Sequence, residues 1–351
     1  MRGAADVSDP SRVGSGRALE PERTNPKMKI DVHAHLYPVA YLDLLDSFGG
    51  SGVGTAIARG RHADQTPDDL DRRLAMMNKA GVDVQVLSVS PQDPYFSNAD
   101  QGVSAARLAN DILADVVRQG GGRFAAFASL PLPHIDAAIA EMRRCFDKLG
   151  MVGITVSTTI LGRPLADAQF DGLFSELDRR EAVVFIHPSG VSLASSIVTN
   201  SHLDGPIGSP FEDTVCTLQL IQARVPERFP GIKFISSHLG GCLPFLMKRI
   251  DIQAPVFMQG PVLPSTEAKR FWYDTVNAHP AALRCACETY GSDRLLLGTD
   301  TPYWQDSLYQ LAVDYVRQSG LSNEVAERIY HENALALFGA KLSKPLNQSD
   351  A

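Results

Sequence analysis

Histidines recur where predicted strands end. His33 and His35 lie two residues apart at the end of the apolar run that opens the folded part of the chain. Residues two apart in a β-strand face the same side, so both imidazoles point in one direction. A neutral imidazole nitrogen is a common ligand of divalent transition metals. The pair therefore predicts half of a metal site.

Three further apolar runs end in a side chain of the same kind: His187, His238 and Asp300. A lone histidine at a strand end is more often structural than a ligand, but four strand ends with this chemistry favour one shared site. The ligand set that we predict is His33, His35, His187 and Asp300. Three imidazoles and a carboxylate suit zinc, and also manganese or iron. An open position would hold a water whose pKa the ion lowers to about 7.

Short apolar runs and longer amphipathic runs alternate from Met28 onward. The predicted strands are residues 29–36, 84–90, 124–131, 153–160, 182–188, 232–240, 271–277 and 294–300. Helical patterns separate them, such as residues 67–80, where Thr66 is the expected N-cap and Gly81 the stop signal. Parallel strands need such crossovers. Eight units predict a (β/α)8 TIM barrel with the metal site at the C-terminal ends of the strands.

Two stretches interrupt the alternation of predicted strands and helices. Residues 189–211 are long and polar, and residues 253–268 are expected to form a loop because they contain Pro255, Pro261 and Pro264. An open, doubly wound sheet is the alternative fold. No Gly-x-Gly-x-x-Gly follows the first strand, which weakens the dinucleotide-binding version of that alternative.

The motifs KIDVHAHLYP, VFIHPSG, ISSHLGGCLPFLMKRID and LLLGTDTPY resemble the amidohydrolase superfamily. More narrowly, the chain is similar to the branch of aminocarboxymuconate-semialdehyde decarboxylase and the resorcylate-, carboxyvanillate- and methylsalicylate-type decarboxylases. The resemblance spans Lys29 to about Gly339. Ser189 occupies a position where the semialdehyde decarboxylases have an aromatic residue, which argues against that particular substrate.

The resemblance implies roles for the predicted site residues. It implies that the four ligands hold one metal ion, that His238 is the acid–base catalyst and that Asp300 helps to move the proton. Binuclear relatives carry a lysine at the end of strand four, whereas this strand reads GITVSTTI, which favours a single ion.

Two arginines are predicted to bind the substrate carboxylate. In the branch, an arginine eleven residues after His238, here Arg249, can reach into the site of a neighbouring subunit; the alternative is a solvated helix residue. Arg61, in the loop after the first strand, is the second candidate, since a guanidinium pairs well with a carboxylate. Arg72 and Arg73 are expected to be surface charges.

The leading hypothesis is a nonoxidative decarboxylase of a small aromatic or conjugated carboxylic acid, with one zinc ion, or manganese in its place, and no organic cofactor. His238, alone or through the metal-bound water, would protonate the carbon that bears the carboxylate. The alternative is a hydrolase or hydratase that uses the same site on a lactone, an amide or a carbon–carbon bond. A barrel that binds without catalysis is the third hypothesis.

Composition limits the partners. The 351 residues carry a formal net charge of −7, which argues against a nucleic-acid-binding face. The sequence contains no run of 18 apolar residues, so we expect no membrane-spanning helix. Five cysteines without a Cys-x-x-Cys pair indicate reduced thiols and a cytoplasmic protein. We expect a disordered tail at 1–27, a barrel at 28–342, a flexible tail at 343–351 and a homodimer or higher homo-oligomer.

Overall fold

The computed structural model describes residues 28–50, 54–191, 193, 195–259 and 262–342. The tails predicted at 1–27 and 343–351 lie outside the described residues. None of the helices in the described ranges has the length and apolar character that a membrane span requires.

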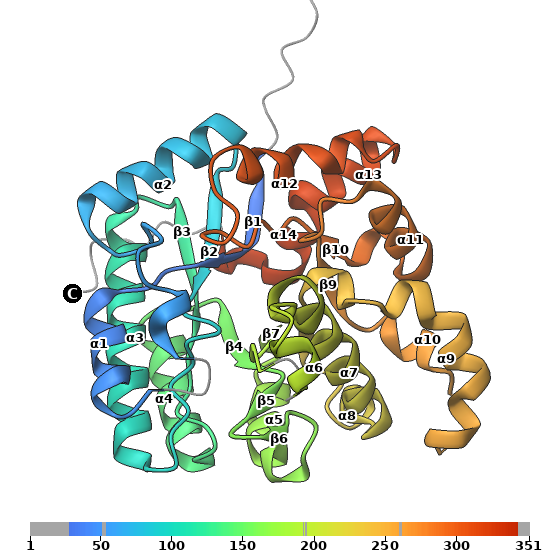
Figure 1. The fold of residues 1–351 in the computed structure, drawn as a ribbon, viewed down its shortest axis with the longest axis horizontal. Helices are drawn as coiled ribbons and strands as arrows, with labels where there is room; N and C mark the ends of the chain where they lie inside the picture. Colours follow the sequence, from blue (N-terminus) through green and yellow to red (C-terminus); the bar gives the residue numbers. More distant parts are fainter. Residues whose placement is uncertain (1–27, 51–53, 192, 194, 260–261, 343–351) are drawn as a thin grey trace, which may run out of the picture.

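Eight parallel strands form the wall of a barrel (Figure 1). In the order in which they pair, they are β1 (Ile30–His35), β2 (Val84–Ser88), β3 (Phe124–Ala128), β4 (Gly153–Ser157), β7 (Val183–His187), β8 (Lys233–Ser236), β9 (Trp272–Asp274) and β10 (Leu295–Leu296). The chain after β10 closes the barrel against β1, because the His35 N–H donates to the Thr301 carbonyl at 2.6 Å and the Val32 N–H to the Leu297 carbonyl at 2.9 Å. The predicted (β/α)8 barrel and its eight strands are confirmed.

Helices surround this wall (Figure 1). The longer ones are α2 (Pro67–Ala80), α3 (Ala99–Gln119), α4 (Ile135–Asp147), α5 (Asp171–Arg179), α7 (Ser209–Gln222), α9 (Leu243–Phe257), α11 (Pro280–Tyr290) and α12 (Ser307–Gln318). Helix α2 has the predicted ends: the Thr66 side chain accepts from the Asp69 N–H, and Gly81 adopts a φ of 67°. A left-handed C-terminal residue of this kind favours glycine, which explains why the helix stops there.

Further elements fill the connections. They are α1 (Val39–Ser47), α6 (Ser196–Thr199), α8 (Val225–Arg228), α10 (Pro264–Ala268), α13 (Asn323–Glu327), α14 (Asn333–Phe338) and the small pair β5 (Thr159–Ile160) and β6 (Arg163–Pro164). The predicted loop at 253–268 is wrong at both of its ends, since α9 continues to Phe257 and α10 begins at Pro264. Proline is tolerated there because Pro255 lies in the last turn of α9 and Pro264 is the first residue of α10.

Apolar side chains fill the barrel interior below the strand ends. Ile30, Val32, Val86, Phe127 and Phe185 belong to one buried cluster, against which Phe338 of α14 also packs. A second, larger buried cluster lies between the strands and the surrounding helices. The packed interior leaves the C-terminal ends of the strands as the place where polar side chains can gather.

Candidate metal centre and catalytic site

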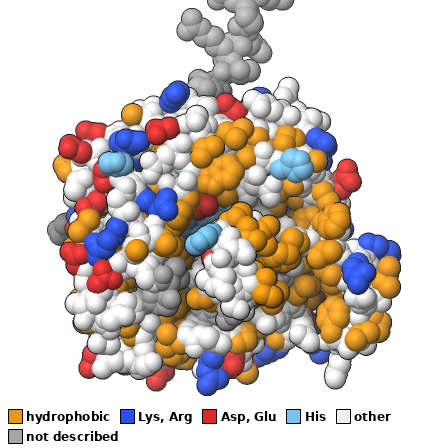
Figure 2. Space-filling view, in the orientation of Figure 1, with side chains coloured by type: hydrophobic (Ala, Val, Ile, Leu, Met, Phe, Trp, Pro, Cys, Tyr) orange, Lys and Arg blue, Asp and Glu red, His pale blue; other side chains and the backbone are white. Residues whose placement is uncertain are grey.

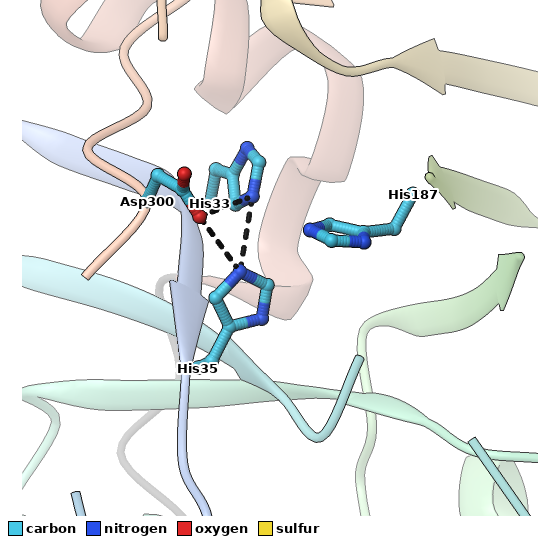
Figure 3. Close-up of side chains that lie close together, drawn as sticks. All are labelled: His33, His35, His187 and Asp300. Carbon is cyan, nitrogen blue, oxygen red and sulfur yellow. Dashed lines mark hydrogen bonds and ion pairs between the residues drawn. The ribbon is translucent and has the colours of Figure 1, made fainter. Parts of the chain in front are cut away.

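Four predicted ligands meet at the C-terminal ends of three segments (Figure 3). His33 and His35 come from β1, His187 is the last residue of β7, and Asp300 follows β10. One potential ligand atom from each lies within 4.8 Å of all the others. His33 Nε2 and His35 Nε2 are 3.1 Å apart, and Asp300 Oδ1 lies 3.3 Å and 3.1 Å from them.

Each histidine of the cluster uses its other ring nitrogen for a fixed hydrogen bond. His33 Nδ1 donates to Asp274 Oδ2 at 2.8 Å, and His187 Nδ1 donates to the Pro188 carbonyl at 2.9 Å. His35 Nδ1 lies 2.9 Å from Ser88 Oγ. These partners leave all three Nε2 atoms for a common centre, which is how protein metal sites orient imidazole ligands.

The donor set fits a divalent cation. Ligands bound at about 2.1 Å lie roughly 3–4 Å from one another, close to the spacing in the cluster. All three histidines are buried, so their imidazoles cannot adopt other orientations without disturbing the barrel. In the described part of β4 the strand ends at Ser157, followed by Thr158, and neither residue can form the carboxylated lysine that bridges two ions. The arrangement suits one ion.

Electrostatics in the cluster also suit a cation. Burial lowers the pKa of His33, but the carboxylates of Asp274 and Asp300 outweigh it and raise that pKa to about 9. Burial lowers the pKa of His35 to about 4. Burial also raises the pKa of Asp300, but His33 and the neighbouring histidines outweigh it, so the pKa lies well below the usual value. A bound ion would replace the His33 proton, because metal ligands are deprotonated.

His238 lies beside this cluster in the turn that follows β8. Its Nδ1 donates to Asp213 Oδ2 of α7 at 2.8 Å, and its Nε2 lies 3.8 Å from Asp300 Oδ2. Burial lowers the pKa of His238, but Asp213 and Asp300 outweigh it and hold that pKa well above the usual value. The geometry suits an imidazole that holds a proton next to the metal ligands.

The backbone is left-handed at both residues of the contact between His238 and Asp300. His238 and Leu239 have φ values of 53° and 58°, and Asp300 has 59°. Such conformations cost energy in non-glycine residues and cluster at functional sites. Gly241 ends the His238 turn at a φ of 64°, and a Cβ there would lie 1.8 Å from the Pro210 carbonyl oxygen. The turn therefore requires glycine because it packs directly on the start of α7.

Three acidic residues of the site were missed in the sequence analysis. Asp274 closes β9 and holds His33, and the strand-end rule applied to residues 271–277 would have found it. Asp213 and Glu212 lie on α7, where the sequence pattern gives no signal for them. Glu212 Oε2 accepts from the Ser189 N–H and from Thr158 Oγ1, both at 2.7 Å, and so fixes the chain after His187.

Arg61 contacts Tyr303, and Tyr303 in turn lies beside His35 of the candidate ligand cluster. Its guanidinium is 4.5 Å from the centre of the Tyr303 ring, which is 5.9 Å from the His35 ring. The Tyr37 hydroxyl donates to the Ser90 carbonyl at 2.7 Å and lies 3.0 Å from the Tyr303 hydroxyl. The structure therefore places Arg61 beside the residues that border the predicted site.

Arg249 is exposed on α9 and is not part of the cluster. It shares one face of that helix with Phe245, Ile252 and Val256, whose exposed fractions are 86%, 68% and 88%. The spacing of four, three and four residues places these side chains in one stripe. Within one chain Arg249 is therefore a solvated residue, and it lies in an apolar surface.

The structure contradicts the prediction for Arg73. Arg72 is exposed and pairs with Asp306 at 3.1 Å, as expected for a surface charge. Arg73 is only 3% exposed, and its guanidinium donates to the His35 carbonyl at 2.6 Å and to Gln85 Oε1 at 3.0 Å. The reason is its helical position, since the buried face of α2 consists of Arg73, Met77 and Ala80.

The surface is hollowed near the middle of the face seen in Figure 2. Histidine and acidic side chains are visible inside the hollow, with hydrophobic side chains along one side and a basic side chain on the other. A site of this kind offers a small anionic molecule both an apolar wall and a cationic group.

Comparison with known proteins agrees with this architecture. The 2-amino-3-carboxymuconate-6-semialdehyde decarboxylase of Dictyostelium discoideum is 29% identical over 91% of this chain and 94% of its own length. A 2,6-dihydroxybenzoate decarboxylase solved in complex with 2,6-dihydroxybenzoate is 25% identical, with a TM-score of 0.75 over 89% of this chain and 99% of that one.

A dihydroxybenzoic acid decarboxylase from Polaromonas sp. JS666 was solved with bound manganese and the inhibitor 2-nitroresorcinol. It is 24% identical, with a TM-score of 0.76 over 91% of this chain and 99% of that one, and it establishes the shared fold. The amidohydrolase family model matches residues 30–340, from the first strand through the last helix of the barrel. The chain therefore belongs to the amidohydrolase family.

Proposed function

We propose that the protein is a metal-dependent, nonoxidative decarboxylase of a small aromatic or conjugated carboxylic acid. The observation that carries the proposal is the position of Asp300, which has one oxygen among the histidine ligands and the other 3.8 Å from His238. Asp300 would thus contact both the metal ion and His238, the proposed proton donor. The activities named for the Dictyostelium discoideum relative and for the 2,6-dihydroxybenzoate decarboxylase described above support the same reaction class.

His33, His35, His187 and Asp300 would hold one divalent ion, zinc or manganese. When bound, the ion would supply a positive charge that orients and stabilises the substrate's carboxylate or a neighbouring hydroxyl. The manganese in the Polaromonas structure is the reason to test that ion beside zinc.

The protein's own groups would then carry out the proton transfer. Arg61 would pair with the substrate carboxylate at the mouth of the site. His238, kept protonated by Asp213, would donate its Nε2 proton to the carbon that bears the carboxylate. The bond between that carbon and the carboxylate breaks, carbon dioxide leaves, and the electron pair of the bond restores the conjugated system. Asp300, whose Oδ2 lies 3.8 Å from His238 Nε2, would help to return a proton from solvent to His238.

The apolar stripe on α9 supports a shared active site between two copies of the chain. Phe245, Ile252 and Val256 are strongly exposed, Arg249 lies among them, and a stripe of exposed apolar side chains favours a protein–protein contact. We propose that a second copy covers this stripe and that Arg249 binds carboxylate in the partner's site. The Phe245→Glu variant should then elute as a monomer with little activity.

Mixed variants test whether Arg249 acts across the subunits. His238→Ala and Arg249→Ala proteins should each be inactive alone. If Arg249 serves the neighbouring site, co-refolded or co-expressed mixtures regain about a quarter of wild-type activity, since half of the randomly paired dimers contain one complete site. If Arg249 acts within its own chain, the mixture stays inactive.

The reaction class is tested by following the carboxyl carbon. Protein loaded with zinc or manganese should release carbon dioxide from hydroxybenzoates or muconate-like acids, without incorporating oxygen from labelled water into the organic product. Hydrolysis of lactones, amides or esters in place of carbon dioxide release would overturn the proposal in favour of a hydrolase. Metal uptake with neither reaction would leave a binding protein.

A further inference from the structure

β1 contains one residue more than β2 at the point where it enters the metal site. Asp31 pairs with Gln85 and Ala34 pairs with Leu87, so three steps along β1 match two steps along β2. This is a β-bulge, a feature that re-aims side chains near active sites. Val32 packs in the barrel interior. The next residue, His33, also faces the interior, since the centre of its ring lies 4.9 Å from the centre of the Phe185 ring. The bulge thus turns two successive side chains inward and brings His33 beside His35.

Asp31 lies on the other side of β1, between the barrel wall and the helices. Its buried Oδ1 accepts from the His33 N–H at 3.2 Å and from the Thr299 N–H at 3.1 Å. Its Oδ2 accepts from Thr299 Oγ1 at 2.7 Å and from Gln85 Nε2 at 2.8 Å. The carboxylate therefore satisfies the His33 amide at the bulge and also fixes the residue that precedes Asp300.

Arg73 completes this set of contacts from α2. Its guanidinium donates to the His35 carbonyl and to Gln85 Oε1, while the amide nitrogen of Gln85 donates to Asp31. A buried cation and a buried anion thus face each other across one amide group. Burying separated charges is expensive, and an apolar side chain would fill the same space at lower cost. Unlike an apolar side chain, Arg73 and Asp31 make hydrogen bonds that fix β1 and the segment before Asp300.

We propose that Arg73, Gln85 and Asp31 form a positioning network that holds the β1 bulge. Through the bulge and Thr299, the network would keep His33, His35 and Asp300 in the arrangement that binds the metal ion. The proposal rests on the metal site proposed above, and it assigns to Arg73 a role in metal affinity and coordination geometry rather than in contact with the substrate.

The test compares two neighbouring arginines of α2. Arg73→Lys keeps the charge but cannot donate to both the His35 carbonyl and Gln85 in the same geometry. Arg72→Lys is the matched control, because Arg72 is exposed and lies one residue away. The affinity for zinc and for manganese is measured by competition with a chelator. The visible spectrum of the cobalt-loaded protein reports coordination geometry, and thermal unfolding is followed on the metal-free protein.

The network predicts that Arg73→Lys weakens metal binding about 10- to 100-fold and changes the cobalt spectrum, while Arg72→Lys stays within about twofold of wild type. Gln85→Met, which removes the bridge but no charge, should show the same loss and serves if an arginine variant does not fold. Unchanged affinity and an unchanged spectrum, with only a lower unfolding temperature, would overturn the proposal. A wild-type protein that binds no metal would instead refute the metal site itself.

Discussion

The two carboxylate oxygens of Asp300 face different neighbours. Oδ1 lies among the imidazoles of His33 and His35, and Oδ2 faces His238. Both Asp300 and His238 have a left-handed backbone at this contact. Under the proposed function, metal binding and proton transfer would therefore meet at one residue, and substitutions on either side of Asp300 should affect them separately.

Removal of the imidazole at position 238 should abolish turnover but not metal binding. His238→Gln is expected to lower kcat about 10²- to 10⁴-fold, because the general acid is lost. Metal content should remain that of wild type, since His238 is not among the four clustered ligands. His62→Gln is the control, because His62 is an exposed histidine with a side chain 58% accessible. Equal loss of bound metal in His238→Gln would contradict the assignment.

The Asp213 carboxylate should set the upper pH limit of activity. Asp213 raises the pKa of His238, so the proton on His238 persists to higher pH than on a free imidazole. In Asp213→Asn that support is absent, and the pKa of His238 falls. The alkaline limb of the kcat profile should therefore move to lower pH, with a smaller change at acidic pH. A profile that keeps its shape while kcat falls uniformly would show that Asp213 acts only by orienting the ring.

At the scale of elements, α7 and the turn after β8 together hold the His238 side chain. Glu212 fixes the chain after His187, the adjacent Asp213 holds His238, and Gly241 packs against Pro210 at the start of the same helix. A helix that joins two strand ends in this way makes the site sensitive to changes in backbone packing away from the ligands.

Gly241→Ala should impair catalysis through this contact. The added Cβ would overlap the Pro210 carbonyl, and the positive φ is also unfavourable for alanine, so the turn must shift. We expect a destabilisation of about 1–3 kcal/mol in denaturant unfolding and a kcat reduced at least tenfold. Gly205→Ala is the control, because a Cβ there meets nothing within 4 Å and the backbone is not left-handed. Wild-type kcat in Gly241→Ala would show that the turn does not position His238.

Side chains whose position follows from strand order could be predicted from the sequence, whereas those whose position depends on packing could not. His33, His35, His187 and Asp300 could be grouped because parallel strands of a barrel all end at one face. Asp213 could not be found, since nothing local marks which helical carboxylate meets a given strand end. Arg73 was assigned to the surface from its charge, although its helical position faces the barrel. The β1 bulge has no sequence signal of its own, and it alone explains why Asp31 and His33 face opposite sides.

At the scale of the whole molecule, the ligand cluster joins segments that are far apart in the chain. β1 carries two of the four candidate ligands, and β7 and the segment after β10 carry one each, so a bound ion would cross-link the barrel near its closing seam. A ligand that binds only the folded state stabilises it by mass action. Metal should therefore protect the entire barrel rather than one loop.

Removal of metal should lower the unfolding free energy in proportion to metal affinity. At a free metal concentration 100 times the dissociation constant, the loaded protein should be about 2.7 kcal/mol more stable than the chelator-treated protein. The difference should shrink in His187→Ala, which removes one of the four candidate ligands. Thermal unfolding at several metal concentrations measures both, and a melting temperature independent of metal would contradict a cross-linking ion.

The number of metal ions that each chain retains tests the proposed metal site most directly. Metal-free protein is incubated with zinc or manganese, passed through a desalting column and analysed for metal content. We expect one ion per wild-type chain and close to none for His187→Ala or Asp300→Ala. Two ions per chain, or retention that survives both substitutions, would contradict the single site formed by His33, His35, His187 and Asp300.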